Sequence, residues 1–192
     1  MTLRLGLLGS GWVADVHLQS ALAAGVEVVA VASHDPVRTA AFAASHGIAR
    51  STTDWRSLCE APDIDAVIVA TPNFLHAEQT LHALSCGRHV LVEKPMAIEV
   101  ADAEAMVAAA TAADRVLCVG HMWRYRAEVR GMRDRIAVGE FGRVVRTHDF
   151  GVHQGWGPSG WFTDRSPTIP SELISLSAQT YPNRLAFCIR SS

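Results

Sequence analysis

Small residues near the amino terminus are spaced in a way that can bind a phosphate group. Gly9, Gly11 and Ala14 fit the pattern G-x-G-x-x-G/A, directly after an apolar run over residues 3–8. Gly9 would permit a tight turn, Gly11 would let a pyrophosphate approach the backbone, and Ala14 would let the next helix pack closely. The unpaired N–H groups at the start of that helix would then face the phosphates. The pattern also occurs in turns that bind nothing, but a second apolar run over 26–32 completes the spacing of a βαβ unit and favours a dinucleotide.

The residues after the second apolar run bear on the choice of dinucleotide. An Asp or Glu at this position would bind the ribose hydroxyls of NAD, and this chain has Ser33 and His34 instead. Asp35 precedes Pro36, so we expect it to be the N-cap of the next helix, with proline in the first turn. Arg38 could reach a 2′-phosphate, or it could be a solvated surface residue. The sequence therefore favours NADP over NAD.

Two polar segments follow later apolar runs. Thr71-Pro72-Asn73 comes after the run over 66–70, and Glu93-Lys94-Pro95 comes after the run over 89–92. Because ligands bind at the carboxyl ends of parallel strands, we expect both segments at the edge that carries Gly9. Glu93-Lys94-Pro95 alone is also typical of a surface turn, since exposed Glu and Lys are common.

Apolar runs alternate with helical patterns along most of the chain. Strands are expected over 3–8, 26–32, 66–70, 89–92 and 116–119, and helices over 12–24, 36–46, 77–86 and 98–112. Gly25 and Gly87 stand where two of these helices should end. This alternation, without internal repeats, predicts an α/β fold with a doubly wound parallel sheet of the Rossmann type. A later helix and a strand over 143–148 would begin a second α/β domain, and the helix should have an apolar face formed by Tyr125, Val129, Met132 and Ile136.

The composition excludes several classes of protein. The 192 residues, 49% hydrophobic and 19% charged, suffice for one well-packed domain and are few for two. A formal charge of −2 gives no electrostatic reason to expect a nucleic-acid or membrane partner. No apolar run reaches the roughly 20 residues of a membrane span, and the amino terminus lacks the pattern of a signal peptide. We expect no metal site and a cytoplasmic protein with reduced, mostly buried cysteines, which are Cys59, Cys86, Cys118 and Cys188.

Four motifs in order strengthen the interpretation. They are Gly9-Ser10-Gly11-Trp12-Val13-Ala14, Ala70-Thr71-Pro72-Asn73 with His76, Gly87 through Glu93-Lys94-Pro95, and Gly120-His121-Met122-Trp123-Arg124-Tyr125. Together they resemble the glucose–fructose oxidoreductase, inositol dehydrogenase and rhizopine-catabolism (Gfo/Idh/MocA) family, and the resemblance extends over residues 2–164. It implies an NAD(P)-dependent oxidoreductase acting on a sugar, cyclitol or related polyol. It also implies a Rossmann domain followed by an α/β domain built on an open sheet.

The resemblance implies roles for individual residues. Lys94 would be catalytic, lying against the nicotinamide and the reacting carbon, where it could stabilise charge or share in proton transfer. Glu93 would order the lysine or the cofactor, and Pro95 would fix the turn, for which a cis bond is one route. His76 without this context would more often be a surface histidine. The expected cofactor site comprises Gly9, Ser10, Gly11, Trp12, Val13, Ser33, His34, Arg38, Thr71, Pro72, Asn73, His76, Glu93, Lys94 and Arg124.

The resemblance stops near Arg165. The family continues into a glycine-rich turn and a helix that bears an Asp and, later, a His; here the last glycine is Gly160 and the last histidine is His153. A frame-shifted or truncated gene product would explain this, as would an authentic variant end that covers the sheet, and we favour the former. The expected organisation is an NAD(P)-binding domain over 1–122, an incomplete start of a substrate domain over 123–164, and a divergent, poorly ordered tail over 165–192.

Three functions are consistent with these residues. The first is hydride transfer between a nicotinamide and a secondary alcohol or ketone of a sugar-like substrate. The second is a catalytically incompetent NAD(P)-binding fragment, and the third is a regulatory protein that uses the cofactor site as a redox sensor. Trp156, Trp161 and Phe162 could pack against a sugar ring or anchor their loop. A homo-oligomer formed through the second domain's sheet is doubtful, because most of that sheet is missing.

Overall fold

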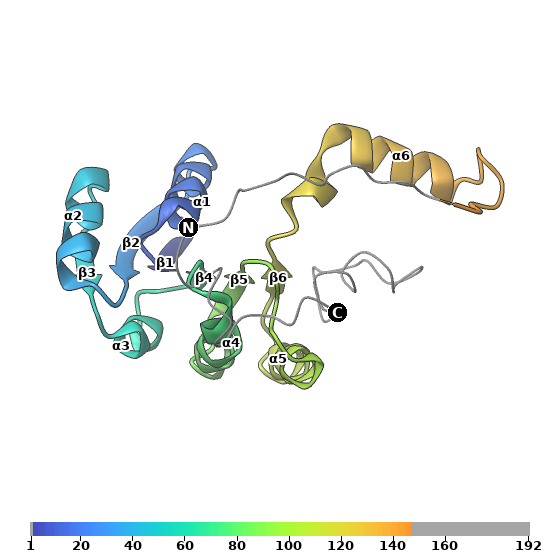
Figure 1. Cartoon of the computed structure of the whole chain (residues 1–192). Helices are drawn as coiled ribbons and strands as arrows, with labels where there is room; N and C mark the ends of the chain where they lie inside the picture. The colour runs from blue at the N-terminus through green and yellow to red at the C-terminus, as the bar shows by residue number, and fades with distance from the viewer. Residues whose placement is uncertain (1, 147–192) are drawn as a thin grey trace. The chain divides into compact units, whose positions relative to one another are not determined.

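A parallel sheet of six strands is the centre of the structure (Figure 1), a computed structural model that describes residues 2–146. The strands are β1 (Arg4–Leu8), β2 (Glu27–Ala32), β3 (Arg50–Thr52), β4 (Ala66–Val69), β5 (His89–Val92) and β6 (Leu117–Val119). Their order is β3-β2-β1-β4-β5-β6, and every neighbouring pair is parallel. The order reverses between β1 and β4, where a doubly wound sheet opens to a ligand.

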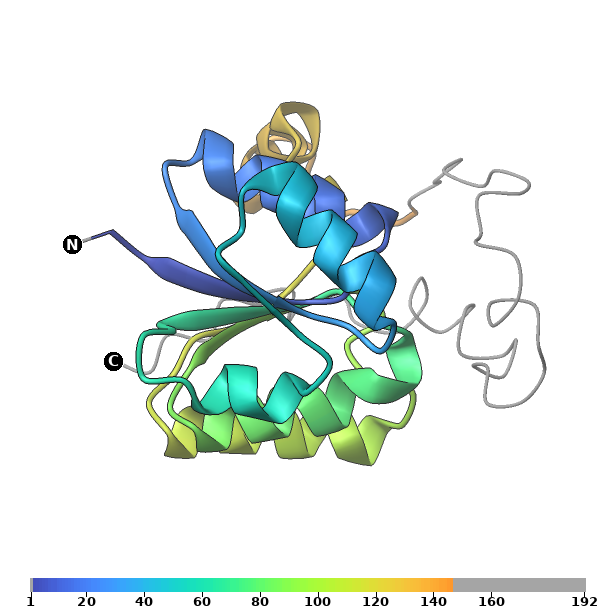
Figure 2. The same cartoon turned by 90° about the vertical axis from the view of Figure 1, so that its left-hand side faces the viewer.

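Helices cover both faces of this sheet (Figure 2). They are α1 (Trp12–Ala23), α2 (Pro36–His46), α3 (Trp55–Glu60), α4 (His76–Ser85) and α5 (Val100–Ala112), with a short 3₁₀ helix, η1 (Asn73–Leu75), before α4. On the face of α1 and α2, Leu18 packs in a buried cluster with Leu7 and Val31. On the face of α3, α4 and α5, Leu84 and Met106 join the other cluster. The predicted doubly wound α/β sheet is confirmed.

Local sequence explains where several of these helices begin and end. Asp35 is the N-cap of α2, as predicted, and its Oδ1 accepts the N–H of Arg38 at 3.0 Å. Asp54 caps α3 in the same way. Gly25 and Gly87, predicted to end helices, have φ angles of +72° and +74°. Helix α1 is different, because its N-cap is Gly11 and has no side chain to accept from the first N–H groups.

Two elements were missed in the sequence, and one predicted strand is absent from the described part of the chain. The missed elements are β3 and α3, which have three and six residues and show too little periodicity to predict. Residues 143–146 of the predicted strand over 143–148 form no strand, and 147–148 lie outside the described residues. A strand needs a neighbour for its backbone groups, and none is present over 121–146.

The described residues divide into two compact units, 2–120 and 121–146. The second unit holds the 3₁₀ helix η2 (Met122–Tyr125) and α6 (Ala127–Ala137). On α6 the predicted apolar residues Val129, Met132 and Ile136 are all exposed. The loop with Trp156, Trp161 and Phe162 and the tail over 165–192 lie outside the described residues. None of the helices between residues 2 and 146 is long and apolar enough to span a membrane.

The cysteines of the described part are free thiols, as expected. Cys59 is buried, whereas Cys86 and Cys118 are partly exposed, and Cys188 lies outside the described residues. Burial raises the pKa of Cys59 to about 12. Cys59 belongs to the buried core, and its raised pKa disfavours the thiolate, which is the reactive form.

Candidate functional site

The candidate residues gather at the carboxyl edge of the sheet. The residues that directly follow β1, β2, β4 and β5 are Gly9, Ser33, Ala70 and Glu93. Backbone hydrogen bonds hold these ends side by side: the N–H of Gly9 donates to Ala32 at 2.8 Å, and the N–H of Glu93 donates to Val69 at 2.9 Å. The parallel sheet therefore brings the glycine turn, the Thr71 segment and the Lys94 segment to one edge, next to the point where the strand order reverses.

The turn after β1 requires glycine at one position and leaves space at another. Gly9 has a φ of +113°, and a Cβ there would stand 2.5 Å from the carbonyl oxygen of Ala70. Gly11 has extended backbone, and nothing lies within 4 Å of a Cβ placed on it. Glycine at this position therefore leaves an open approach to the backbone at the uncapped start of α1.

Side chains around this turn also fit a polar ligand. Ser10 is buried, and its Oγ has no hydrogen-bond partner within the described residues. A buried hydroxyl without a partner carries a desolvation penalty that a phosphate oxygen could relieve. Trp12 is 70% exposed and Val13 is partly buried at the start of α1. The residues present thus fit the pyrophosphate of a dinucleotide.

The end of β2 carries no acidic side chain free to bind ribose hydroxyls. Ser33 is partly buried, and His34 and Arg38 are exposed. Asp35 is used as the N-cap, and the Arg38 N–H bonded to its carboxylate is the largest influence that lowers the pKa of Asp35. Arg38 lies in the first turn of α2 with its side chain exposed, five residues after Ser33.

The segment after β4 forms a compact polar turn. Thr71 Oγ1 donates to Oε1 of the buried Gln79 at 2.6 Å, and Pro72 is partly buried. Asn73 is buried, and its Oδ1 has no hydrogen-bond partner within the described residues. His76, at the start of α4, is only 1% exposed, and its ring lies between the carbonyls of Thr71 and Pro95. His76 therefore belongs to the interior behind the edge.

Glu93, Lys94 and Pro95 follow β5. The Glu93 carboxylate is 6% exposed; His17 Nε2 lies 2.9 Å from its Oε1, and the Lys94 N–H donates to its Oε2 at 2.9 Å. Burial is the largest single influence on the pKa of Glu93 and by itself would raise it. The hydrogen bonds from His17 and Lys94 together outweigh burial, so the pKa lies below its ordinary value. The Lys94–Pro95 bond is cis. Lys94 itself is exposed, and it is the single lysine of the chain.

Three residues of this edge were not predicted from the sequence. His17 lies one turn after Ala14 on α1, so the i, i+3 spacing could have placed it on the face toward the sheet. Gln79 lies one turn after His76 on α4 by the same rule. Gly120 follows β6, and a Cβ there would stand 2.8 Å from Glu93 Oε1. Because glycine has no Cβ, position 120 leaves room for the buried Glu93 carboxylate.

Arg124 belongs to the second compact unit, where it lies in η2 and is partly buried. Its predicted role in binding the cofactor stays a prediction. Within residues 2–146 no group of three or more His, Cys, Asp or Glu side chains could hold a metal ion.

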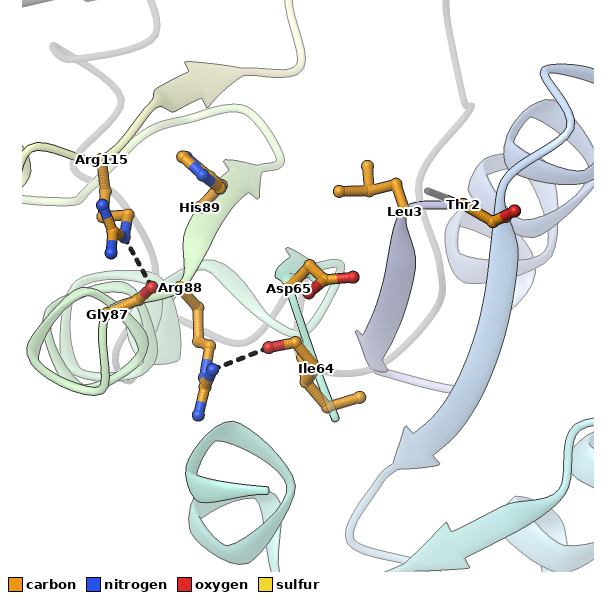
Figure 3. A pocket seen from close by; sticks show the side chains of 8 residues that line it. All are labelled: Thr2, Leu3, Ile64, Asp65, Gly87, Arg88, His89 and Arg115. Atoms are coloured by element: carbon orange, nitrogen blue, oxygen red, sulfur yellow. Dashed lines mark hydrogen bonds between the residues drawn. The ribbon is translucent and has the colours of Figure 1, made fainter. Parts of the chain in front are cut away.

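A pocket of about 470 Å³ lies at the other, amino edge of the sheet (Figure 3). It is lined by Thr2, Leu3, Ile64, Asp65, Gly87, Arg88, His89 and Arg115. Arg88 donates to the carbonyls of Cys59 and Ile64 at 2.9 and 2.8 Å, and Arg115 donates to Gly87 at 2.7 Å. Both guanidinium groups are therefore occupied by backbone carbonyls in α3 and in the loops that follow α3 and α4. Among the described residues, no buried polar side chain without a partner lines this pocket.

Several proteins of known activity are similar to this chain. It is 43% identical over 166 residues to the 1,5-anhydro-D-fructose reductase of Ensifer adhaerens, covering 84% of this chain and 49% of that protein. It is 34% identical over 181 residues to the inositol 2-dehydrogenase 3 of Saccharopolyspora erythraea, covering 93% and 49%. The chain thus spans about half the length of the curated relatives it matches.

Solved structures support the same relationship. The WlbA dehydrogenase of Bordetella pertussis, determined with NADH and UDP-GlcNAcA, superimposes with a TM-score of 0.70 at 30% identity, over 74% of this chain and 44% of that one. The sequence of residues 3–121 matches the family model described as the oxidoreductase family with an NAD-binding Rossmann fold. These residues include every strand of the sheet. From the sheet, the glycine turn and these matches, we conclude that the chain belongs to the Gfo/Idh/MocA family of oxidoreductases.

Proposed function

We propose that this chain is the NAD(P)-binding part of an oxidoreductase that transfers a hydride between a nicotinamide and a secondary alcohol or ketone of a sugar- or cyclitol-like substrate. The observation that carries the proposal is one edge of the sheet. There an open glycine turn, the single lysine and two buried polar atoms (Ser10 Oγ and Asn73 Oδ1) lie after neighbouring strands, and neither atom has a hydrogen-bond partner within residues 2–146. The relatives named above act on an anhydro sugar and a cyclitol, which supports the substrate class.

Different residues of this edge would bind the cofactor and act on the substrate. The N–H groups at the start of α1 would donate to the pyrophosphate across the open side of Gly11, and the helix dipole would favour its negative charge. The nicotinamide, when bound, gives or accepts the hydride. Lys94 would donate a hydrogen bond to the substrate oxygen and stabilise the charge that develops on it. Thr71, Pro72 and Asn73 would line the cofactor, with the Asn73 Oδ1 supplying an acceptor.

The end of β2 supports NADP as the preferred cofactor. Asp35 is committed to the N-cap of α2, so no carboxylate at this end of the strand is free to accept bonds from two ribose hydroxyls. Ser33 and the exposed guanidinium of Arg38 are suited to a 2′-phosphate, since guanidinium and phosphate pair through two parallel hydrogen bonds.

The remaining expectations concern surroundings and partners. The free thiols of Cys59, Cys86 and Cys118 support a reducing compartment such as the cytoplasm. A small polyol or sugar-like molecule is the one partner that we propose, and we propose no nucleic acid, membrane or homo-oligomer.

Calorimetric titration of the full chain with NADPH and NADH tests the cofactor. We expect NADPH to bind at least about tenfold more tightly than NADH, a difference of about 1.4 kcal/mol. Arg38→Ala should remove most of the preference, and Ser33→Asp should reverse it by offering a carboxylate to the ribose. Equal binding of both cofactors by the wild type would overturn the NADP assignment, and binding of neither would overturn the cofactor site itself.

Turnover of a panel of sugars and cyclitols with NADP tests the enzyme. We expect Lys94→Met to lower kcat by about 100-fold or more while the NADPH affinity changes little, because the ammonium acts on the reacting oxygen. Lys94→Arg is the matched control that keeps the charge. Binding of NADPH without turnover of any substrate would favour the alternative, a cofactor-binding fragment.

A further inference from the structure

Two histidines contact the segment that carries Lys94, and they come from opposite faces of the sheet. His17 is on α1, which covers one face, and His76 is on α4, which covers the other (Figure 2). Both side chains reach the residues that directly follow β5.

His76 connects the ends of two neighbouring strands. Its Nδ1 lies 2.8 Å from the carbonyl oxygen of Pro95, and its Nε2 lies 2.9 Å from that of Thr71. Both carbonyls can only accept, so each needs an N–H from the ring. Burial is the largest influence on the pKa of His76 and lowers it, although the two carbonyls act in the other direction. The neutral ring therefore has one N–H, which it donates to one of the two carbonyls at a time.

His17 acts on the residue before Lys94. Its Nε2 donates to Glu93 Oε1, and the other oxygen of that carboxylate accepts the N–H of Lys94. Glu93 is buried and both of its oxygens are engaged, so its carboxylate is used to hold the backbone. The orientation of the carboxylate depends on His17, because Gly120 offers no side chain on the remaining side.

We propose that His17 and His76 are positioning residues for Lys94, an inference that rests on the proposed role of that lysine. The N–H of Lys94 is held by Glu93, which His17 orients, and the carbonyl of the next residue, Pro95, accepts from His76 in the tautomer that carries the proton on Nδ1. Lys94 has a long, exposed side chain that is flexible in itself. A fixed backbone on both sides limits where its ammonium group can lie, and such placement is worth orders of magnitude in rate.

A labelling experiment can follow Lys94 without measuring activity. Reductive methylation of the full chain with ¹³C-formaldehyde labels the lysine and the terminal amine, and the Lys94→Arg variant identifies which NMR signal is the lysine. We expect His76→Leu to shift this signal toward its position in the unfolded chain. His76→Asn should keep it near the wild-type position, because the Asn amide nitrogen replaces Nδ1 opposite Pro95. Thr80→Val, one turn further along the buried face of α4, removes an unpartnered hydroxyl and should leave the signal in place.

The second histidine is tested in the same way. His17→Leu should shift the Lys94 signal, and His17→Gln, which keeps a donor for Glu93, should restore it. Ser20→Ala, three residues along α1 at an exposed position, is the control. If His76→Leu fails to fold, as judged by circular dichroism, the comparison of His76→Asn with His76→Gln decides for that position. Gln replaces Nε2 opposite Thr71 and should leave Pro95 without a donor.

Kinetics complete the test. In the Leu variants we expect kcat to fall by about 10-fold or more while the NADPH dissociation constant stays within about threefold, a separation that general destabilisation would not produce. An unmoved Lys94 signal in folded His76→Leu and His17→Leu would overturn the proposal, and so would an equal shift in Thr80→Val. A wild type that binds NADPH but turns over no substrate would instead count against the proposed function, because the NMR result does not depend on turnover.

Discussion

The two edges of the sheet differ in where their polar groups find hydrogen-bond partners. At the amino edge, Arg88 and Arg115 line a pocket, and their guanidinium groups donate to backbone carbonyls in α3 and in the loops after α3 and α4. At the carboxyl edge, α1 begins without a side-chain cap, and Ser10 and Asn73 each have a buried oxygen that finds no partner in the described part of the chain. The hydrogen bonds of the amino edge are made within the chain, whereas the carboxyl edge keeps polar groups that a ligand could satisfy.

This difference shows that hollow shape alone does not identify a site in this protein. The pocket at the amino edge holds polar groups whose hydrogen bonds are made within the chain (Figure 3). Buried polar atoms without partners are rare in folded proteins, so their presence beside Gly9 carries more information about a ligand than a volume does. Changes at the amino edge should therefore affect stability, and changes at the carboxyl edge should affect binding.

The glycine turn offers the sharpest separation of the two effects. Gly9→Ala places a Cβ 2.5 Å from the backbone oxygen of Ala70 at a φ of +113°, so we expect a loss of unfolding free energy of about 3 kcal/mol or more. Gly11→Ala meets nothing within 4 Å and has extended backbone, so stability should change by less than about 0.5 kcal/mol. Urea unfolding of the two variants measures this.

The affinity for NADPH should be sensitive to Gly11→Ala even though the stability is not. Gly11→Ala keeps its fold but should bind NADPH at least about tenfold more weakly, because the methyl group stands where the pyrophosphate would approach. A Gly11→Ala variant with wild-type NADPH affinity would contradict the assignment of this turn to the cofactor.

Arg88→Met tests the amino edge. The substitution removes the donors to Cys59 and Ile64, and we expect the unfolding free energy to fall by about 1–3 kcal/mol. NADPH affinity should not change. Arg56→Met is the matched control, since Arg56 is exposed and forms a surface ion pair with Glu78, worth at most about 1 kcal/mol. A marked loss of NADPH binding in Arg88→Met would remove the distinction between the two edges.

The doubly wound parallel sheet and the edge at which the candidate residues gather could be predicted because both follow from local patterns. The apolar runs gave the strands β1, β2, β4, β5 and β6, and parallel pairing brings their ends together without further information. Asp35 could be predicted to be the N-cap of α2 because Asp before Pro is a local signal, and the structure confirms it. Short elements such as β3 and α3 lack this periodicity and depend on packing.

The contacts behind the edge could not be predicted in the same way. His76 was expected to line the cofactor, and the structure places its ring in the interior between two carbonyls. Which face of α4 is buried depends on how the helix lies on the sheet. The pair of His17 and Glu93 joins residues 76 positions apart, and no local pattern specifies such a contact. The three-dimensional packing alone decides it.

The dependence of stability on pH is the smallest expected effect, and it tests the interior of the carboxyl edge. The pKa of His76 lies below 6.5, chiefly through burial, and that of Glu93 lies below 4.5 through the bonds from His17 and Lys94 that outweigh its burial. Of the charged groups around His76, Glu93 raises its pKa and Lys94 lowers it, both less than burial does. The unfolded chain therefore binds protons more readily than the folded chain.

The contributions of His76 and Glu93 to the unfolding free energy should accordingly be fully present above about pH 6.5. The unfolding free energy should fall as the pH is lowered, first because His76 takes up a proton on unfolding and, below about pH 4.5, because Glu93 does so as well. The slope that His76 contributes cannot exceed about 1.4 kcal/mol per pH unit, the limit for one proton. Urea unfolding between pH 8 and 5 measures it, with His76→Asn expected to flatten the upper part of the curve and Thr80→Val to keep it. A stability that instead rises on acidification from pH 7 to 6 would mean that the ring charges readily and donates to Thr71 and Pro95 at once. His76 would then hold both segments together rather than serving one carbonyl at a time.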